Sequence, residues 1–235
     1  MTNRMVAAAA VAAVLAAAQT SPPKKPKKQV SWLVSLQRFL GISATPAGLK
    51  GEDEADPQPG DIWVTGLSGG DTPRPLTSDG GYRSPIFGGG GKAILALKGA
   101  GLVEISLSGG GVRSLPAPPN LSKLVARESG PPGRILALTA DDRGGLFAPS
   151  SVEMEGGSIE DRALLRRLKN WTRVYDGLTL FVKPRGPNVR NGWTDIFVQQ
   201  GSAQPVEISH CLGDFCSQPS LSEDRRQVVF IRTAK

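Results

Sequence analysis

Three residues near the C-terminus are the first candidates for chemistry: His210, Cys211 and Cys216. Thiolates and imidazoles bind zinc, but a structural zinc site takes four ligands, and His210 is the only histidine of the chain. The two cysteines bracket the short segment Leu212–Phe215, which contains a glycine, so a tight loop can bring them within bonding distance. The spacing therefore predicts a disulfide and no metal site.

The sequence gives little support for a catalytic site. A Ser-His-Asp arrangement would have to use His210, and the chain has no α/β region to hold a nucleophilic serine at a strand-to-helix turn. The glycine run Gly88–Lys92 continues into Ala93, where a phosphate-binding loop needs serine or threonine. Two pairs of adjacent acids fit turns and helix starts: Asp141, Asp142, Glu160 and Asp161. We expect neither enzymatic activity nor a cofactor.

A basic amphipathic segment runs from Ser158 to Arg173, where leucines and a tryptophan interleave with arginines. Such a helix or long loop suits an acidic partner or a membrane surface. Alternatively, it is a helix that covers the fold and leaves its arginines in solvent. Aromatic and arginine side chains are favoured interface anchors. The candidate partner-binding residues are Trp171, Arg166, Arg167 and Arg173 on this segment, and Tyr82 and Arg83 on a loop.

From Gly60 onward, short apolar runs alternate with clusters of Gly, Pro, Ser and Asp, a pattern typical of β-strands and turns. An ordered series of runs begins with Asp61-Ile62-Trp63-Val64 and continues through Leu76-Thr77, Ser84-Pro85-Ile86-Phe87 and Ala93–Leu97. The series recurs near the C-terminus: Asp195-Ile196-Phe197-Val198, Val206–Ser209, Gln218–Leu221 and Gln227–Ile231. A four-strand unit that recurs about every 40–45 residues predicts the blades of a β-propeller.

These runs resemble the repeats of the TolB-like, WD-type propeller family over roughly Gly60 to Ile231. The resemblance implies an all-β fold in which the Ser-Pro strand of each repeat lies innermost and the D-I-[WF]-V strand belongs to an outer pair. This chain departs from the family at the Ser-Pro-Asp-Gly turn, where Gly88–Lys92 and Ser222–Arg226 stand instead.

The strand order also predicts how the fold closes. The repeats open with an outer pair, Asp61 to Thr77, and end with an inner pair, Ser217 to Arg232. Joining them gives one complete blade and removes two exposed sheet edges. We then expect about four blades, with inner pairs near 84–97, 122–139, 171–183 and 217–232. Four is the lower limit for propellers, so the alternatives are a dimer, a distorted ring, or a fragment that completes a larger propeller in another chain.

The N-terminal part predicts export. Residues 1–18 combine a positive start, the apolar run Met5–Leu15 and small residues before a cut after Ala18, as in a bacterial signal peptide; an uncleaved anchor is the alternative. Residues 19–59 contain a Pro/Lys spacer, an amphipathic helix at Val30–Leu40 and a linker. The helix packs on the main domain or docks to a partner. Residues 60–235 form the propeller domain of a periplasmic or secreted protein.

The formal charge of +7 is concentrated at the N-terminus. Five basic residues lie there: Arg4, Lys24, Lys25, Lys27 and Lys28. The remainder has 23 basic and 21 acidic residues, too balanced for the broad positive field that nucleic-acid binding requires. The Lys-rich spacer suits peripheral contact with an anionic membrane or a cell-wall polymer.

The combination predicts a non-catalytic protein–protein interaction module, whose rigid ring holds loops in place for an unidentified protein partner. The alternative is a small-molecule or glycan-binding propeller, or a hydrolytic one, with its site in a central funnel. The residues visible for that alternative are Tyr82, Asp214 and Phe215.

Overall fold

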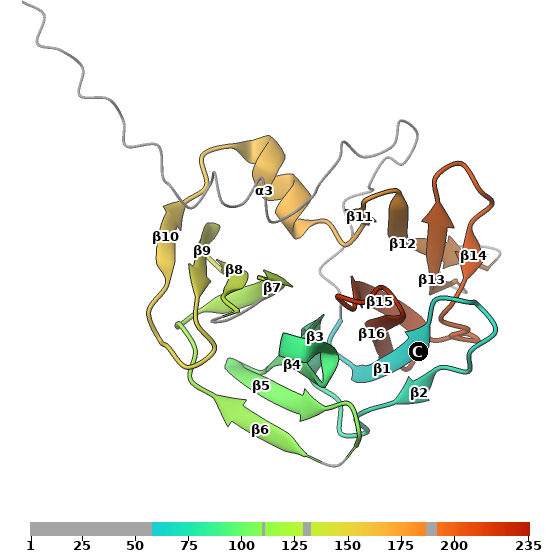
Figure 1. The fold of residues 1–235 in the computed structure, drawn as a ribbon, viewed down its shortest axis with the longest axis horizontal. Helices are drawn as coiled ribbons and strands as arrows, with labels where there is room; N and C mark the ends of the chain where they lie inside the picture. Colours follow the sequence, from blue (N-terminus) through green and yellow to red (C-terminus); the bar gives the residue numbers. More distant parts are fainter. Residues whose placement is uncertain (1–57, 110, 129–132, 187–191) are drawn as a thin grey trace, which may run out of the picture. The chain divides into compact units, whose positions relative to one another are not determined.

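The structure, a computed structural model, describes residues 58–109, 111–128, 133–186 and 192–235. The predicted signal peptide, and almost all of the predicted spacer, helix and linker at 19–59, lie outside the described residues. The described residues form mainly β-strands, arranged in three sheets, with a single α-helix (Figure 1). The predicted all-β class is therefore confirmed.

Two of the sheets are antiparallel and follow chain order. The first has these strands: β3 (Tyr82–Phe87), β4 (Ala93–Lys98), β5 (Gly101–Ser106) and β6 (Val112–Leu115). The second has these strands: β7 (Leu121–Arg127), β8 (Ile135–Thr139), β9 (Arg143–Phe147) and β10 (Glu155–Ser158). A short 3-10 turn, η1 (Gly89–Gly91), links β3 to β4. Each sheet is one meander of four strands.

The third sheet has eight strands and consists of two such meanders. One contains β11 (Arg173–Tyr175), β12 (Leu178–Arg185), β13 (Trp193–Gln200) and β14 (Val206–Glu207). The other contains β15 (Phe215–Leu221), β16 (Gln227–Thr233), β1 (Asp61–Gly66) and β2 (Arg74–Pro75). A single parallel pair, Thr194 with Phe215, joins the two meanders. The strands therefore form four units of four.

The fourth unit draws its strands from both ends of the described chain. β1 pairs antiparallel with β16 in a register that runs from Asp61 opposite Arg232 to Gly66 opposite Gln227. The predicted joining of the first and last strands is therefore present. β16 is apolar over Val228–Ile231, and all four of these residues are fully buried.

Both faces of this unit are covered, which explains the unbroken apolar run. Val229 and Ile231 pack in a core with Ile94 of β4, on one side of the sheet. Val228 and Phe230 point to the other side and pack with Leu180 of β12. Successive residues of a strand face opposite ways, so a strand buried on both faces has no polar alternation.

The β7–β10 unit is covered on one face by the β3–β6 unit and on the other by α3 (Arg162–Lys169). Asp161 caps the helix, because its Oδ1 accepts hydrogen bonds from Ala163 N at 2.9 Å and Leu164 N at 3.1 Å. Leu168 is fully buried against Leu136 and Leu138 of β8. The helix is therefore part of the core packing.

A buried hydrogen bond links strands of two different units. Ser84 N, in β3, donates to Gln218 Oε1, in β15, at 2.5 Å. Both residues precede a proline, both have positive φ (52° and 57°), and each lies where its strand slips register against its neighbour. The Ser84-Pro85 and Gln218-Pro219 segments, which belong to corresponding runs of the sequence repeat, thus have the same backbone irregularity.

Candidate functional site

The segment Leu212–Phe215 forms a loop closed by a disulfide between Cys211 and Cys216, whose Cα atoms are 6.2 Å apart. The predicted pairing is therefore confirmed, and it fits a protein of an oxidising compartment. Both cysteines are fully buried and pack in the core between β12–β13 and β15–β16. We call Cys211–Cys216 the disulfide loop.

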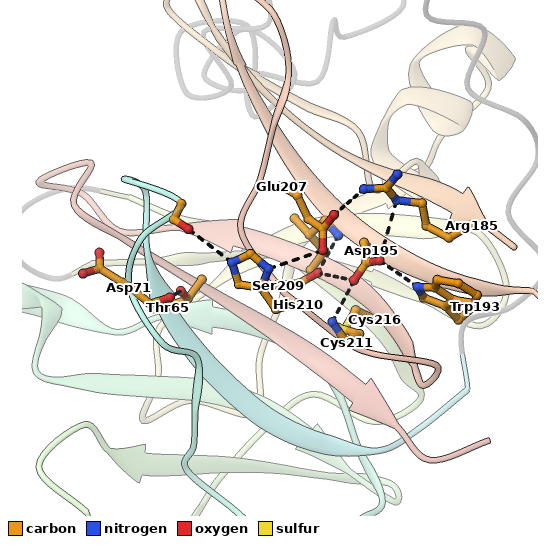
Figure 2. Close-up of polar contacts among 12 residues, drawn as sticks. Thr65, Asp71, Arg185, Trp193, Asp195, Glu207, Ser209, His210, Cys211 and Cys216 are labelled. Atoms are coloured by element: carbon orange, nitrogen blue, oxygen red, sulfur yellow. Dashed lines mark hydrogen bonds and ion pairs between the residues drawn. A yellow bond between two sulfur atoms is a disulfide. The ribbon is translucent and has the colours of Figure 1, made fainter.

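Asp195 supports this loop from inside the domain (Figure 2). Only 2% of the residue is exposed. Its Oδ1 accepts hydrogen bonds from Cys211 N at 2.8 Å and from Ser209 Oγ at 3.0 Å, and its Oδ2 accepts one from Trp193 Nε1 at 2.8 Å. A buried carboxylate is tolerated only when it is paired and fully hydrogen-bonded. Asp195 therefore fixes the start of the loop.

The aspartate in the first copy of the repeated D-I-[WF]-V sequence accepts the two corresponding hydrogen bonds at its Oδ1. Asp61 Oδ1 accepts hydrogen bonds from Thr77 Oγ1 at 3.1 Å and Gly80 N at 2.8 Å, as Asp195 does from Ser209 and Cys211. In each copy the backbone N–H of the following isoleucine donates to that hydroxyl, at 2.9 Å for Ile62 and 2.8 Å for Ile196. The aspartate of the repeat thus positions a turn.

Arg232 ties the outer part of the loop to β16. Its Nε donates to Asp214 Oδ2 at 2.7 Å, and its Nη2 donates to the carbonyl of Cys211 at 3.1 Å. The guanidinium also lies 4.6 Å from the centre of the Trp63 ring. The loop is therefore held by a disulfide, a buried carboxylate and an ion pair, and little ordering entropy remains to be lost on binding.

The loop directs two apolar side chains outward. Leu212 is 88% exposed and Phe215 is 36% exposed. Leu212 also has φ of 52°, in the left-handed region, which costs a residue with a Cβ about 1–2 kcal/mol. Glycine would avoid both penalties. An exposed apolar side chain in a rigid, strained loop is typical of a contact site.

A cluster of charges lies beside the loop (Figure 2). Glu207 pairs with Arg185 Nη2, and its Oε1 is 3.4 Å from His210 Nδ1. His210 Nε2 is 3.2 Å from the carbonyl oxygen of Gly69. Both ring nitrogens are thus engaged. Among the residues the structure describes, no group of three or more His, Cys, Asp or Glu is placed to hold a metal ion.

Three of the predicted partner-binding residues are core residues, and this corrects the prediction for them. Trp171 is 5%, Arg173 8% and Tyr82 0% exposed, so they offer no surface to a partner. Lys123 Nζ lies 3.3 Å from the Trp171 ring centre and donates to the carbonyl of Lys169 at 2.5 Å. Arg173 donates to the carbonyl of Asn170. These cations cap the negative end of α3.

The other predicted residues remain accessible. Arg166 and Arg167 are exposed on α3, and Arg83 is partly buried, with its Nη2 donating to the carbonyl of Gly99 at 2.9 Å. The segment matches the second interpretation made from its sequence: its leucines cover the fold and two arginines face solvent. Of the residues suggested for a funnel site, Tyr82 is engaged with Lys98, and Asp214 with Arg232.

Asp79, Lys98 and Tyr82 form a small titratable group at the start of β3. Asp79 pairs with Lys98 Nζ, which also donates to the Tyr82 hydroxyl at 3.1 Å. The bond to Lys98 lowers the pKa of Asp79 below its ordinary value of 3.8, and burial raises the pKa of Tyr82 above its ordinary 10.0. Asp79 therefore contributes stability in its ionised form.

We predict a measurable acid sensitivity from this pair. Because the pKa of Asp79 is lower in the folded than in the unfolded chain, its contribution is present above about pH 4 and is lost as the pH falls through the lowered value. Asp79→Asn should flatten the fall of the melting temperature between about pH 5 and pH 2.5. Lys98→Met should flatten the same part of the melting-temperature curve, because it removes the partner of Asp79. The double variant should show no more flattening than either single variant. The prediction would be contradicted if the melting temperature of all three variants fell with decreasing pH as steeply as that of the wild type.

The residues that sequence reasoning missed are Asp195, Arg185 and Leu212. The repeat of Asp61-Ile62 and Asp195-Ile196 already marked Asp195 as structurally equivalent to Asp61. For Leu212 the available signal was an apolar residue inside a short segment bracketed by cysteines. Nothing in the sequence places Arg185 near Glu207, because the two lie on different strands.

Comparison with known proteins adds no relative. The chain matches no protein family, no curated protein and no solved structure. Within the described ranges, no helix is both long and apolar enough to cross a membrane.

Proposed function

We propose that the described domain is a four-bladed β-propeller of the TolB-like type. The four strand units support this, because each is an antiparallel meander of four strands, as in a blade. Contacts between units also run in a cycle. β15 contacts β3, β3 contacts β7, Lys123 of β7 bonds the carbonyl of Asn170 just before β11, and β13 pairs with β15. A ring of four blades accounts for every one of these contacts.

Export follows from the disulfide and from the expected signal peptide. Disulfides persist in oxidising compartments such as the periplasm or the cell exterior. Cys211 and Cys216 form such a disulfide, and both are buried in the core. We place the mature protein in the periplasm or outside a bacterial cell, with the predicted signal at residues 1–18 removed.

In this role the protein is a non-catalytic module that binds another protein, and the disulfide loop is its primary contact. The observation that carries the proposal is Leu212, which is 88% exposed at the tip of a loop held rigid by Cys211–Cys216, Asp195 and Arg232. Phe215, at the other end of the same loop, is also exposed, at 36%. Arg166 and Arg167, exposed on α3, are secondary contacts for an acidic surface.

The expected energetics are those of a binding hot spot. Complete burial of a leucine side chain stabilises a complex by about 1.5–3 kcal/mol, which is about a 10- to 100-fold change in Kd. Because the loop is already ordered, little of this gain is offset by loop entropy. Leu212→Asp removes the apolar contact and introduces a charge that has to be desolvated.

The test uses a photo-crosslinking amino acid placed at residue 212 and, as a matched control, at Val152. Val152 is also apolar and is 60% exposed, but it lies in the loop between β9 and β10. We expect a discrete adduct in the producing cells from position 212 and none from position 152. Leu212→Asp should weaken binding of the identified protein at least about 10-fold, whereas Val152→Asp should leave it unchanged. Equal adducts from both positions, or none from 212, would refute the proposal.

A further inference from the structure

The side chain of Arg127, the last residue of β7, has no polar partner among the residues that the structure describes. None of the hydrogen bonds, ion pairs or ring contacts of these residues involves its guanidinium. Its Nε is buried, and it is the one buried side-chain nitrogen or oxygen in the described ranges without a hydrogen bond. An arginine has five N–H donors and cannot lose its charge, so an unpaired guanidinium at a partly buried site is unfavourable.

Two glycines make room for this guanidinium. A Cβ added to Gly89 would lie 2.9 Å from Arg127 Nη2, and one added to Gly133 would lie 2.7 Å from both Nε and Nη2. Gly133 has φ of 61°, which by itself favours glycine, but the backbone of Gly89 is not left-handed. Gly89 is therefore needed for space, and larger residues at either position would displace the guanidinium.

The acidic residue next to Arg127 in the sequence, Glu128, forms its ion pair with a different arginine. Glu128 follows Arg127 directly, but its carboxylate pairs with Arg134, with Nε to Oε2 at 2.9 Å and Nη2 to Oε1 at 3.4 Å. Arg134 also lies 3.5 Å from Glu155. Lys92, exposed at the end of the glycine run, adds a second positive charge to the loop that contains Gly89. The local balance of charge around Arg127 is therefore positive.

We propose that Arg127, between Gly89 and Gly133, is a binding site for a small oxyanion, a carboxylate or a phosphate. The planar guanidinium fork matches two oxygens of either group, and such charge-assisted pairs are the strongest hydrogen bonds that a side chain makes. The two glycines place no side chain of their own against the fork. This site shares no residue with the disulfide loop, so it does not depend on the function proposed above.

The experiment titrates the purified protein with sodium phosphate and, separately, with sodium acetate, each against sodium chloride of matched ionic strength. The side-chain Nε–H resonance of Arg127 in nitrogen–proton spectra is the direct readout. We expect a saturable shift of this resonance with at least one anion, and a Kd at least 10-fold weaker in Gly89→Ala. Arg127→Met should lose the anion-dependent rise in melting temperature that the wild type shows.

Two controls separate binding from a structural role. Arg113→Met removes an exposed arginine paired with Glu104 and should keep the full anion response. In sodium chloride alone, Arg127→Met should melt no lower than the wild type, because it replaces an unpaired buried nitrogen with an apolar group. A wild type and an Arg127→Met variant that respond alike to both anions, or an Nε–H resonance that does not move, would overturn the proposal.

Discussion

Truncation of the chain before Ser217 is expected to abolish cooperative unfolding altogether. The truncation removes most of β15 and all of β16, including Val228–Ile231, which are fully buried. Each such side chain contributes about 1.5–3 kcal/mol on burial, so their sum approaches the entire stability of a typical domain, about 5–15 kcal/mol. The truncation also exposes β1 along its whole length and opens an edge that promotes aggregation.

Calorimetry of the full chain and the truncated chain measures this effect. The full chain should give one transition, and the truncated chain should give none. Phe230→Ala, within β16, provides a graded version and should lower the free energy of unfolding by about 3–5 kcal/mol. Removal of only Ala234 and Lys235, which are exposed, should change nothing measurable. A truncated chain that still melts cooperatively would mean that the shared unit of β15, β16, β1 and β2 is dispensable for the fold.

The second large effect is expected from Asp195→Ala, which should reduce the free energy of unfolding by about 3–5 kcal/mol. The substitution leaves Cys211 N, Ser209 Oγ and Trp193 Nε1 without their acceptor in a buried site. It also removes the carboxylate that faces Arg185 Nε at 3.8 Å. Urea denaturation followed by tryptophan fluorescence gives the change directly.

Matched variants make this prediction specific. Asp61→Ala removes the equivalent carboxylate of β1. This carboxylate is partly exposed and accepts fewer hydrogen bonds than that of Asp195, so the substitution should lower the free energy of unfolding by about 1–2 kcal/mol. Asp71→Ala, at an exposed position, should stay within about 0.5 kcal/mol of the wild type.

The disulfide provides an independent measure of the same loop. Replacing Cys211 and Cys216 with alanine should cost about 2 kcal/mol from loop closure alone, because the closed loop is short. Since Asp195 and the disulfide order the same segment, the triple variant should lose less than the sum of the separate losses. Strict additivity, or an Asp195→Ala cost below that of Asp61→Ala, would show that Asp195 does not organise the loop.

Several features of this protein could be predicted from the sequence because they depend on local patterns. The inner pairs expected near 84–97, 122–139, 171–183 and 217–232 correspond to β3–β4, β7–β8, β11–β12 and β15–β16. The order of the repeat predicted the pairing of β1 with β16, and the spacing of the cysteines predicted the disulfide. In each case neighbouring residues carry the information, as period-two apolar runs, turn residues or a short loop.

Strands with weak local patterns were not predicted. β9 begins with Arg143, Gly144 and Gly145, and β10 contains two glycines among polar residues, so neither has an apolar alternation. Their positions follow from pairing instead. Gly145 lies opposite Ala137 of β8 and Gly156 of β10, and a Cβ on Gly156 would lie 2.0 Å from the carbonyl oxygen of Gly144. Only the assembled sheet makes these glycines necessary.

The exposure of individual side chains was decided by the tertiary structure alone. Tyr82 and Trp171 are of residue types that often anchor interfaces. In the structure, however, Tyr82 packs with Ile62 and Val229, and Trp171 lies against Lys123. Leu212 is of a residue type that is usually buried, yet it faces solvent on a loop whose shape depends on Asp195 and Arg232. Local sequence determines which residues can form a strand or turn, whereas burial depends on contacts with residues distant in the chain, and these exist only once the units have packed together.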